Sequence, residues 1–219
     1  MPNLIIVDDP AQWRFDVPGA EVVSARSYLT DEEFVNRKTS RVFNLCRSYR
    51  YLSEGYYVSL LAEARRHKPL PSLMTIQDMK SQSITRLVSD ELDELFQKSL
   101  SHLQSNEFTL SIYFGHNVAQ HYEKLSMNLF SLFQAPLLRA FFRRNGKWEL
   151  HKLTAISTGE IPDHHRNFVQ EVAQQYFAGK RQHLPRRSTP RYRLAILTNP
   201  QEAEAPSNEK ALQKFVKAA

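Results

Sequence analysis

The sequence predicts an α+β fold, with a mixed sheet, interleaved helices and one antiparallel hairpin. Short apolar runs that are typical of strands alternate irregularly with segments of helical periodicity, so no regular strand–helix repeat emerges. Residues 136–157 form two apolar arms around Asn145-Gly146, and Asn-Gly between strands favours a tight type I′ hairpin turn. The 219 residues, 42% hydrophobic and 24% charged, suffice for one large or two small domains with a buried core.

Strands are expected where short apolar runs are bounded by turn residues. The clearest case is the period-2 alternation of Phe108, Leu110, Ile112 and Phe114, which predicts a half-buried strand. The expected strands cover residues 4–9, 20–29, 41–46 and 108–115, and residues 72–79 are expected to form a strand that runs into a turn.

Helices are expected where apolar residues recur every three or four positions behind a capping residue. Thr30, which precedes three acidic residues, indicates a short helix or turn, and Ser53 and Ser89 each begin a longer helix. The predicted buried face of the helix after Ser53 consists of Tyr56, Tyr57, Leu60, Leu61 and Ala64. Further helices are expected over residues 124–133 and 161–180, the latter with Phe168, Val172, Tyr176 and Phe177 on its apolar stripe and Gly179 as its C-terminal cap.

The charge distribution predicts a domain (residues 1–184), a basic linker (185–192) and a final part (193–219). Residues 180–193 hold six Lys and Arg and no acid, which equals the net charge of +6, so the rest of the chain is neutral. Such a segment is typical of a solvated linker, with phosphate binding as the alternative. Residues 193–200 are expected to form a strand and 208–219 a helix capped by Ser207. One strand and one helix cannot bury their faces alone, so we expect the incomplete start of a further domain of a longer protein.

Motifs of catalytic chemistry are missing from the sequence. It has no phosphate-binding glycine loop, no nucleophile elbow and no zinc-protease motif, so neither a catalytic residue nor a metal site is expected. The single Cys46 cannot form an internal disulfide. No apolar run approaches the roughly 20 residues of a membrane span, and the N-terminus lacks the pattern of a secretory signal, so the cytoplasm is the expected compartment.

The stretch RSYRYLSEGYY, residues 47–57, is the strongest candidate for a binding loop. Ser53 and Glu54 start a helix whose backbone N–H groups attract an anion, which Arg47 and Arg50 could clamp through bidentate hydrogen bonds. In the alternative interpretation the tyrosines pack on the core, Ser53 is only a cap and the arginines are solvated. The tyrosines beside arginines could also stack single-stranded nucleic acid, but the neutral remainder of the chain argues against this.

The run RVFNLCRSYRYLSEGYYVSLLAEARRHKPLPSLMTIQDM, residues 41–79, resembles the central signature of the RimK-like ATP-grasp N-terminal domain. The resemblance extends over most of residues 1–184, and RYRLAILTNPQEAEAPSNEKALQKF, residues 191–215, resembles the opening strand and helix of the ligase part that follows this domain. The resemblance implies an α+β fold and an accessory role beside ATP-dependent amide-bond formation. It supplies no established catalytic residues.

For the complete protein, the resemblance implies a carboxylate–amine ligase that uses ATP and Mg²⁺, held by a C-terminal ATP-grasp domain of the same chain. The present chain is then expected to be inactive by itself and to select or position a peptide or amino-acid substrate. The expected contacts are Arg47, Arg50, Ser53, Glu54 and Tyr56, with Thr75, Gln77 and Asp78 as a second polar edge. A structural module that builds a homo-oligomer, nucleic-acid binding through residues 180–193, and a self-contained enzyme are the alternatives.

Overall fold

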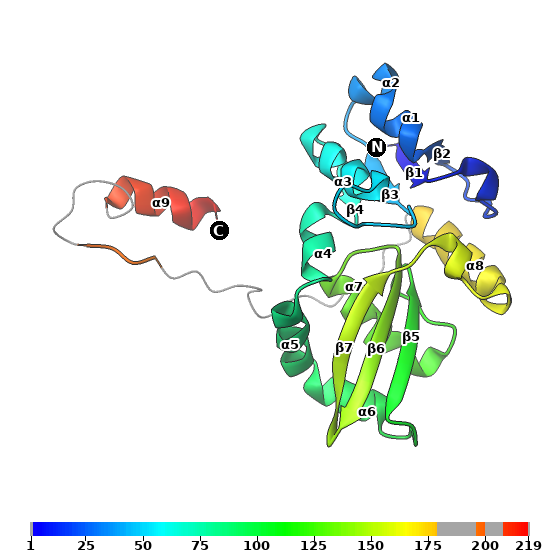
Figure 1. Ribbon diagram of the computed structural model, residues 1–219, viewed down its shortest axis with the longest axis vertical. Coiled ribbons are helices and arrows are strands. Elements are labelled where there is room, and N and C mark those ends of the chain that lie inside the picture. Colours follow the sequence, from blue (N-terminus) through cyan, green and yellow to red (C-terminus); the bar gives the residue numbers. More distant parts are fainter. Residues whose placement is uncertain (1, 179–195, 200–207, 219) are drawn as a thin grey trace. The chain divides into compact units, whose positions relative to one another are not determined.

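The computed structural model describes residues 2–178, 196–199 and 208–218 (Figure 1). The chain divides into two compact units, Met1–Pro185 and Arg186–Ala219, and each is described separately. The prediction of an α+β fold is confirmed. The strands do not form one mixed sheet, however, because the first unit contains a four-stranded parallel sheet and a separate three-stranded antiparallel sheet.

The parallel sheet has the strand order β2-β1-β3-β4. Its strands are β1 (Asn3–Val7), β2 (Ala20–Ser24), β3 (Arg41–Asn44) and β4 (Lys68–Leu70). The chain passes from β1 to β2 on one side and then crosses to β3 on the other side, so the direction of winding reverses between β1 and β3. Both faces are covered, which explains why the apolar run Leu4–Val7 is buried without alternation.

Helices α1 (Ala25–Thr30), α2 (Glu32–Val35) and α3 (Glu54–Ala64) contribute to the core on one face of the parallel sheet. On that face, Leu4, Ile6 and Val42 belong to one cluster with the helix residues Tyr28, Val58 and Ala62. On the other face, Ile5 and Phe43 share a cluster with Val169 and Val172 of α8 (Arg166–Phe177). This second cluster also includes Tyr113 and Leu137 of the antiparallel sheet, so it joins the two sheets through one apolar core.

Three predictions for residues 20–64 are wrong in detail. Residues 20–29 are a strand only as far as Ser24, whose Oγ accepts a hydrogen bond from Ser27 N and thereby starts α1. The residue before α2 is Asp31 and not Thr30, which ends α1. Helix α3 begins behind Ser53 as predicted, but its buried residues are Gly55, Val58, Ser59 and Ala62 and not the predicted face.

Residues 72–79 form a helix, α4 (Leu73–Asp78), and not a strand. The Ser72 Oγ accepts a hydrogen bond from Thr75 N at 3.0 Å, which is the contact of an N-terminal cap. The helix expected behind Ser89 is two helices, α5 (Gln82–Glu91) and α6 (Asp93–Leu100). Ser89 is therefore not a cap but a buried residue inside α5, where its Oγ accepts a hydrogen bond from Leu150 N at 2.8 Å.

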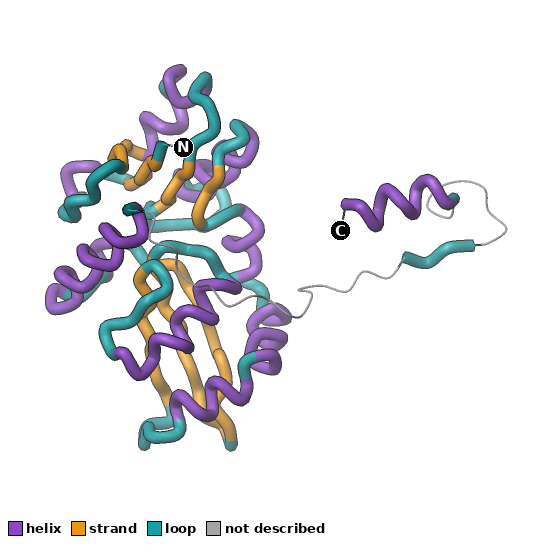
Figure 2. Tube along the Cα trace, turned by 180° about the vertical axis from the view of Figure 1, so that it is seen from behind, coloured by secondary structure: helices purple, strands orange, loops and turns teal. Residues whose placement is uncertain are grey.

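The antiparallel sheet has the order β5-β6-β7 and contains the predicted hairpin. Its strands are β5 (Glu107–Tyr113), β6 (Leu137–Asn145) and β7 (Lys147–Ala155). Only Gly146 of the Asn-Gly pair has a positive φ, so the turn is not of type I′. Helices α5, α6 and α7 (Glu123–Leu132) cover one face of the sheet, which is seen from the helix side in Figure 2.

Short 3-10 turns connect the longer elements and place several loop side chains. They are η1 (Pro10–Gln12), η2 (Gln120–Tyr122), η3 (Thr158–Glu160) and η4 (Asp163–His165). Helix α8 starts at Arg166 and not at residue 161 as predicted. Ile161 and Pro162 are not helical, and the turn η4 lies between them and the helix. The predicted apolar stripe of this helix does pack against the core that joins the two sheets.

In the second unit, α9 (Glu209–Ala218) confirms the predicted helix. Asn208 Oδ1 accepts a hydrogen bond from Ala211 N at 2.8 Å, and the predicted cap Ser207 lies outside the described residues. Residues 196–199 of the predicted strand 193–200 have no regular secondary structure, whereas Gly179 and the basic segment 180–193 are outside the described residues. None of the helices described here is both long enough and apolar enough to span a membrane.

Candidate functional site

A cavity of about 250 Å³ opens at the carboxyl ends of β1 and β3, where the order of the parallel strands reverses. Ligands of open parallel sheets bind at this position, because the loops that leave the two strands diverge there. We call it the arginine cavity. Its lining residues are Val7, Asp8, Asp9, Trp13, Arg14, Phe15, Leu45, Arg47, Thr158, Gly159 and Arg166.

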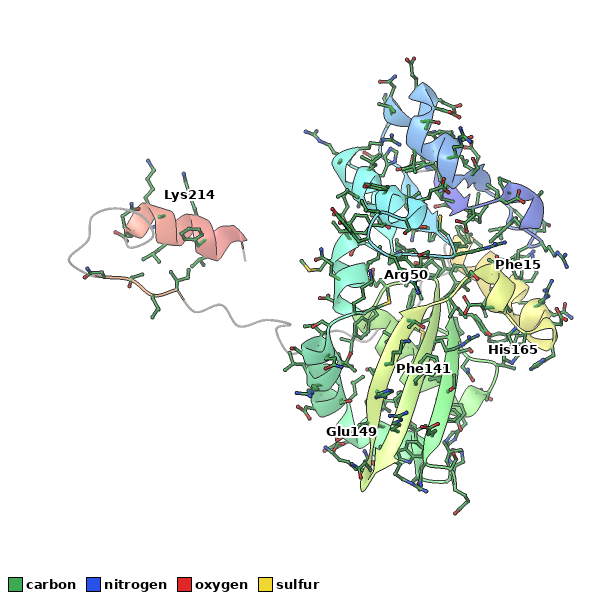
Figure 3. The ribbon with its side chains drawn as sticks, viewed as in Figure 1. Phe15, Arg50, Phe141, Glu149, His165 and Lys214 are labelled. Atoms are coloured by element: carbon green, nitrogen blue, oxygen red, sulfur yellow. The ribbon has the colours of Figure 1, made fainter. Side chains whose placement is uncertain are left out.

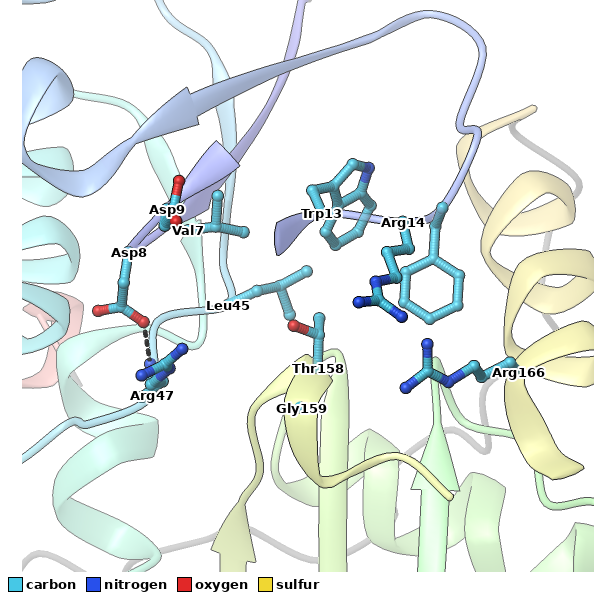
Figure 4. A pocket seen from close by; sticks show the side chains of 11 residues that line it. Val7, Asp8, Asp9, Trp13, Arg14, Leu45, Arg47, Thr158, Gly159 and Arg166 are labelled. Carbon is cyan, nitrogen blue, oxygen red and sulfur yellow. Dashed lines mark hydrogen bonds between the residues drawn. The ribbon is translucent and has the colours of Figure 1, made fainter. Parts of the chain in front are cut away.

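Three arginines from distant parts of the sequence line the arginine cavity. Arg14 lies in the loop before β2, Arg47 follows β3, and Arg166 is the first residue of α8. Figure 4 shows the guanidinium groups of Arg14 and Arg166 directed towards the same space. The Arg14 guanidinium makes no ion pair with any described residue. The planar donors of these side chains suit a carboxylate or a phosphate, each of which can accept two parallel hydrogen bonds.

The loop that carries Arg14 is attached to the helix that carries Arg166. Asp16 N donates a hydrogen bond to Gln170 Oε1 at 2.9 Å, and Gln174 Nε2 donates to the Asp16 carbonyl oxygen at 3.1 Å. The Gln170 amide also donates to that carbonyl oxygen. These contacts hold the loop of Arg14 against the helix of Arg166.

Two carboxylates in the cavity wall are engaged with the backbone. Asp8 Oδ2 accepts a hydrogen bond from Arg47 N at 2.7 Å, shown as a dashed line in Figure 4, and Asp9 Oδ1 accepts one from Ala11 N at 3.0 Å. They therefore shape the loops that leave β1 and β3. With three guanidinium groups against two carboxylates, the lining keeps an excess of positive charge for an anionic ligand.

Arg166 stands at a helix position that opposes its charge. The N-terminus of a helix carries partial positive charge, which disfavours a cation in the first turn. Asp163 offsets this cost, since its Oδ1 lies 2.8 Å from Arg166 Nε, and the terminal nitrogens remain on the cavity side of that contact.

The opposite wall of the cavity is the turn η3, which supplies Thr158 and Gly159. A capping box holds this turn, because the Glu160 carboxylate accepts hydrogen bonds from Ser157 N at 2.9 Å and from Ser157 Oγ at 3.1 Å. Arg139 of β6 donates to the Glu160 carbonyl oxygen at 3.0 Å. The wall is thus anchored to the antiparallel sheet.

A second and larger cavity, of about 590 Å³, lies along residues 47–50 and the end of β7. We call it the basic groove. Its lining residues are Arg47, Ser48, Tyr49, Arg50, Ile76, Met79, Lys80, Gln82, Thr85, His151, Lys152, Leu153, Thr154 and Ala155. The lining contains no Asp or Glu, and Arg47 is common to both cavities.

Of the five contacts predicted in the binding loop, Arg47 lines both cavities, Arg50 lines the basic groove, and the other three line neither. Ser53 Oγ accepts a hydrogen bond from Tyr56 N at 3.3 Å and lies 2.7 Å from the Arg50 carbonyl oxygen, so this hydroxyl closes the loop as a cap. Glu54 is exposed in the first turn of α3. The Tyr56 ring packs edge-on against Tyr51 and Tyr57, with ring centroids 5.5 and 5.7 Å away.

The predicted second polar edge lies on α4 and lines neither cavity. Thr75 and Asp78 are buried, and Thr75 Oγ1 lies 3.0 Å from Ser72 Oγ at the start of the helix. Gln77 is exposed between them. In this structure, Thr75 therefore serves the helix start.

Sequence reasoning missed most of the arginine cavity. The acidic pair Asp8-Asp9 directly follows a buried strand, and this was the one signal that could have indicated the site. Arg14, Thr158 and Arg166 come from loops and a helix start without a recognisable motif. Among the described residues, no three His, Cys, Asp or Glu side chains gather as the ligands of a metal ion would.

A comparison with protein families gives a match. Residues 25–172, more than half of the chain, match the family described as RimK-like ATPgrasp N-terminal domain. The match includes Arg47, Thr158 and Arg166 of the arginine cavity and the whole basic groove. A search of curated proteins gave no match. The chain belongs to the RimK-like ATP-grasp N-terminal domain family.

Proposed function

We propose that this chain is the non-catalytic substrate-recognition part of a RimK-like ATP-dependent carboxylate–amine ligase, and that the arginine cavity binds an anionic group of a peptide or amino-acid substrate. The observation that carries the proposal is that Arg14, Arg47 and Arg166 line one cavity at the reversal point of the parallel sheet. A cavity of about 250 Å³ is large enough for a small acid or the end of a peptide.

The recognition role agrees with the chemistry of the cavity. A guanidinium group stays charged at all ordinary pH values and cannot serve as a general base, and the two carboxylates already accept backbone hydrogen bonds. The arrangement can therefore bind and orient an anion.

ATP and Mg²⁺ belong in this proposal to a C-terminal ATP-grasp domain that activates a carboxylate for attack by an amine. The described residues do not fit the nucleotide, since the arginine cavity has no glycine-rich phosphate loop and no group of three possible metal ligands is present among them. We therefore assign this chain no step of the bond-forming reaction.

Calorimetric titration of the whole chain with L-glutamate and with the neutral amide isostere L-glutamine tests the recognition role. We expect glutamate to bind and glutamine to bind at least about tenfold more weakly, because a neutral amide cannot replace a carboxylate between guanidinium groups. Arg14→Gln and Arg166→Gln should each weaken glutamate binding by about tenfold or more.

Arg26→Gln is the matched control, because Arg26 is an exposed arginine of α1 that does not line the arginine cavity. This variant should bind glutamate as the unmodified protein does. Equal binding of glutamate and glutamine would exclude recognition of the side-chain carboxylate, because both amino acids carry the same α-carboxylate. No binding of either, together with self-association in ultracentrifugation, would instead favour the structural module that builds a homo-oligomer.

A further inference from the structure

The basic groove is lined by three segments of the first unit, and each segment supplies at least one cation. Arg47 and Arg50 belong to the loop after β3, Lys80 lies between α4 and α5, and Lys152 lies in β7. All four residues are exposed to solvent. A ligand in the groove can therefore reach their charged groups directly.

These cations are not neutralised by acids of the protein. The lining contains no Asp or Glu, and no acid among the described residues forms an ion pair with Arg50, Lys80 or Lys152. Lys80 Nζ donates to the Tyr49 carbonyl oxygen at 2.8 Å, which holds this ammonium group in place and uses only one of its three donors. Lys152 Nζ lies 5.9 Å from the centre of the Phe141 ring, on the sheet face shown in Figure 3. The groove therefore keeps its positive charge for a ligand.

The charge of the lining distinguishes the ligands of the two cavities. The arginine cavity sets three guanidinium groups against two carboxylates, so a ligand with one negative charge balances it. The basic groove has four Lys and Arg side chains and no carboxylate. It also includes Gln82, the first residue of α5, where the helix dipole adds partial charge of the same sign. A phosphate monoester, with about two negative charges at neutral pH and three acceptor oxygens, suits this lining better than a single carboxylate does.

The size of the groove leaves room for an organic group beside the phosphate. Its volume of about 590 Å³ lies in the range of small-molecule sites, whereas the arginine cavity has about 250 Å³. Tyr49, Met79 and Ala155 line the groove between the cations. The Tyr49 hydroxyl donates to the Asn44 carbonyl oxygen at 2.6 Å, so the polar end of this side chain is occupied and its ring is held in place. The groove therefore offers apolar surface next to its charges.

We propose that the basic groove binds a small organic phosphate, with its phosphate group held by Arg50, Lys80 and Lys152 and its organic part against Tyr49 and Met79. Charge-assisted hydrogen bonds to the phosphate supply most of the affinity, and the apolar contact selects phosphates that carry an organic group. The proposal concerns a site other than the arginine cavity. It does not depend on the recognition of a carboxylate there or on the ligase assignment.

The test is a titration of the whole ¹⁵N-labelled chain with phenyl phosphate at pH 7.5, followed by amide NMR. We expect saturable shifts of the Arg50, Lys80 and Lys152 amides. Benzenesulfonate has the same ring and a tetrahedral anion but only one negative charge, so it should bind at least about tenfold more weakly. Inorganic phosphate keeps the charge but lacks the ring, so it should bind about threefold or more weakly than phenyl phosphate.

Lys80→Gln and Lys152→Gln should each weaken phenyl phosphate binding by about threefold or more, because each removes one cation next to the phosphate. Arg143→Gln is the control, since the Arg143 side chain is 58% exposed on the same sheet as Lys152, pairs with Glu107 and lies outside the groove. This variant should bind phenyl phosphate as the unmodified protein does.

A pair of variants separates the groove from the arginine cavity. Arg14 lines only the arginine cavity and Lys80 lines only the groove. Phenyl phosphate bound in the groove should keep its affinity in Arg14→Gln and lose affinity in Lys80→Gln. L-glutamate bound in the arginine cavity should show the opposite pattern. Failure of this proposal and failure of the proposed carboxylate recognition therefore give different results.

Four results would overturn the proposal. The first is a loss of phenyl phosphate affinity in Arg14→Gln without a loss in Lys80→Gln, which would place the phosphate in the arginine cavity. The second is equal affinity for benzenesulfonate, and the third is absence of saturable binding up to about 5 mM phenyl phosphate. The fourth is tighter binding of a short oligothymidylate with shifts of the same amides, which would assign the cations to a nucleic-acid backbone.

Discussion

Asn44 Nδ2 donates a hydrogen bond to the carbonyl oxygen of Gly55 at 2.6 Å and so ties the end of β3 to the first turn of α3. The same amide donates to Ser59 Oγ at 2.9 Å, and its oxygen accepts a hydrogen bond from Cys46 N at 3.2 Å. Asn44 is completely buried, and each of these bonds satisfies a group that water cannot reach. The loop that separates the two cavities starts from this anchor.

Replacement of Gly55 by alanine should destabilise the protein. An added Cβ would lie 2.4 Å from the Ser48 carbonyl oxygen and 2.7 Å from Cys46 Cβ, so the backbone of the loop or of α3 must move. We expect a loss of about 1–3 kcal/mol in the free energy of unfolding, measured by urea titration. Gly159→Ala is the control and should change stability little, because the nearest atom to its Cβ is 3.9 Å away. Equal stability of the two variants would contradict the close packing of Gly55.

Acidification should destabilise the fold through His67. Desolvation by burial lowers the pKa of His67 below its usual value of 6.5, and the hydrogen bond to the Arg37 carbonyl oxygen offsets only part of this effect. The Nδ1 atom of the ring lies 2.9 Å from the Tyr28 hydroxyl, and its Nε2 atom lies 3.3 Å from the Arg37 carbonyl oxygen. The neutral ring can accept from Tyr28 and donate to Arg37, whereas the protonated ring can only donate.

The unfolded chain takes up this proton at a higher pH than the folded chain. The stability due to neutral His67 is therefore present above about pH 6.5 and is lost as the pH falls through the lower folded pKa. In urea titrations at pH 7.5 and 5.5, His67→Gln should lose less stability between the two pH values than the unmodified protein. An identical loss in both proteins would exclude His67, and the lowered pKa of His165 would then be the next cause to examine.

Cys46 should resist thiol reagents while the protein is folded. The side chain is completely buried, and this burial raises the pKa of the thiol, with a further contribution from the charges of Asp8 and Glu54. We expect modification by an aromatic disulfide reagent at pH 8 to be at least about 100-fold slower in buffer than in denaturing urea, because the thiolate is the reactive form. Similar rates in both solutions would mean that β3 and the loop open readily.

The sequence predicted the type of most long elements, because periodicity and capping are local signals. Ser53 and the alternation of residues 108–114 placed α3 and β5 correctly. Errors arose where a serine cap interrupts an apolar run, as Ser24 and Ser72 do, since each starts a helix inside a segment that reads as a strand. The buried face of α3 depends on Asn44 and on the contact of Gly55 with Ser48, which no periodicity could indicate.

The candidate site was harder to predict, because strand order decides which loops meet. Arg47 and Arg50 were predicted as binding residues because they belong to a loop rich in charged residues and tyrosine. Arg14 and Arg166 are separated from them by long stretches of sequence and come together only because β1 lies next to β3 and α8 packs on the parallel sheet.

Arg47 belongs to the lining of both the arginine cavity and the basic groove. A single guanidinium group cannot adopt two positions at once, so an anion that draws it into one cavity changes the charge that the other cavity presents. By thermodynamic linkage, the two effects are equal. The change that a ligand in the arginine cavity makes to the free energy of binding in the groove equals the change that a ligand in the groove makes to the free energy of binding in the cavity. If both cavities bind anions, we therefore expect the short loop after β3 to couple the two binding equilibria.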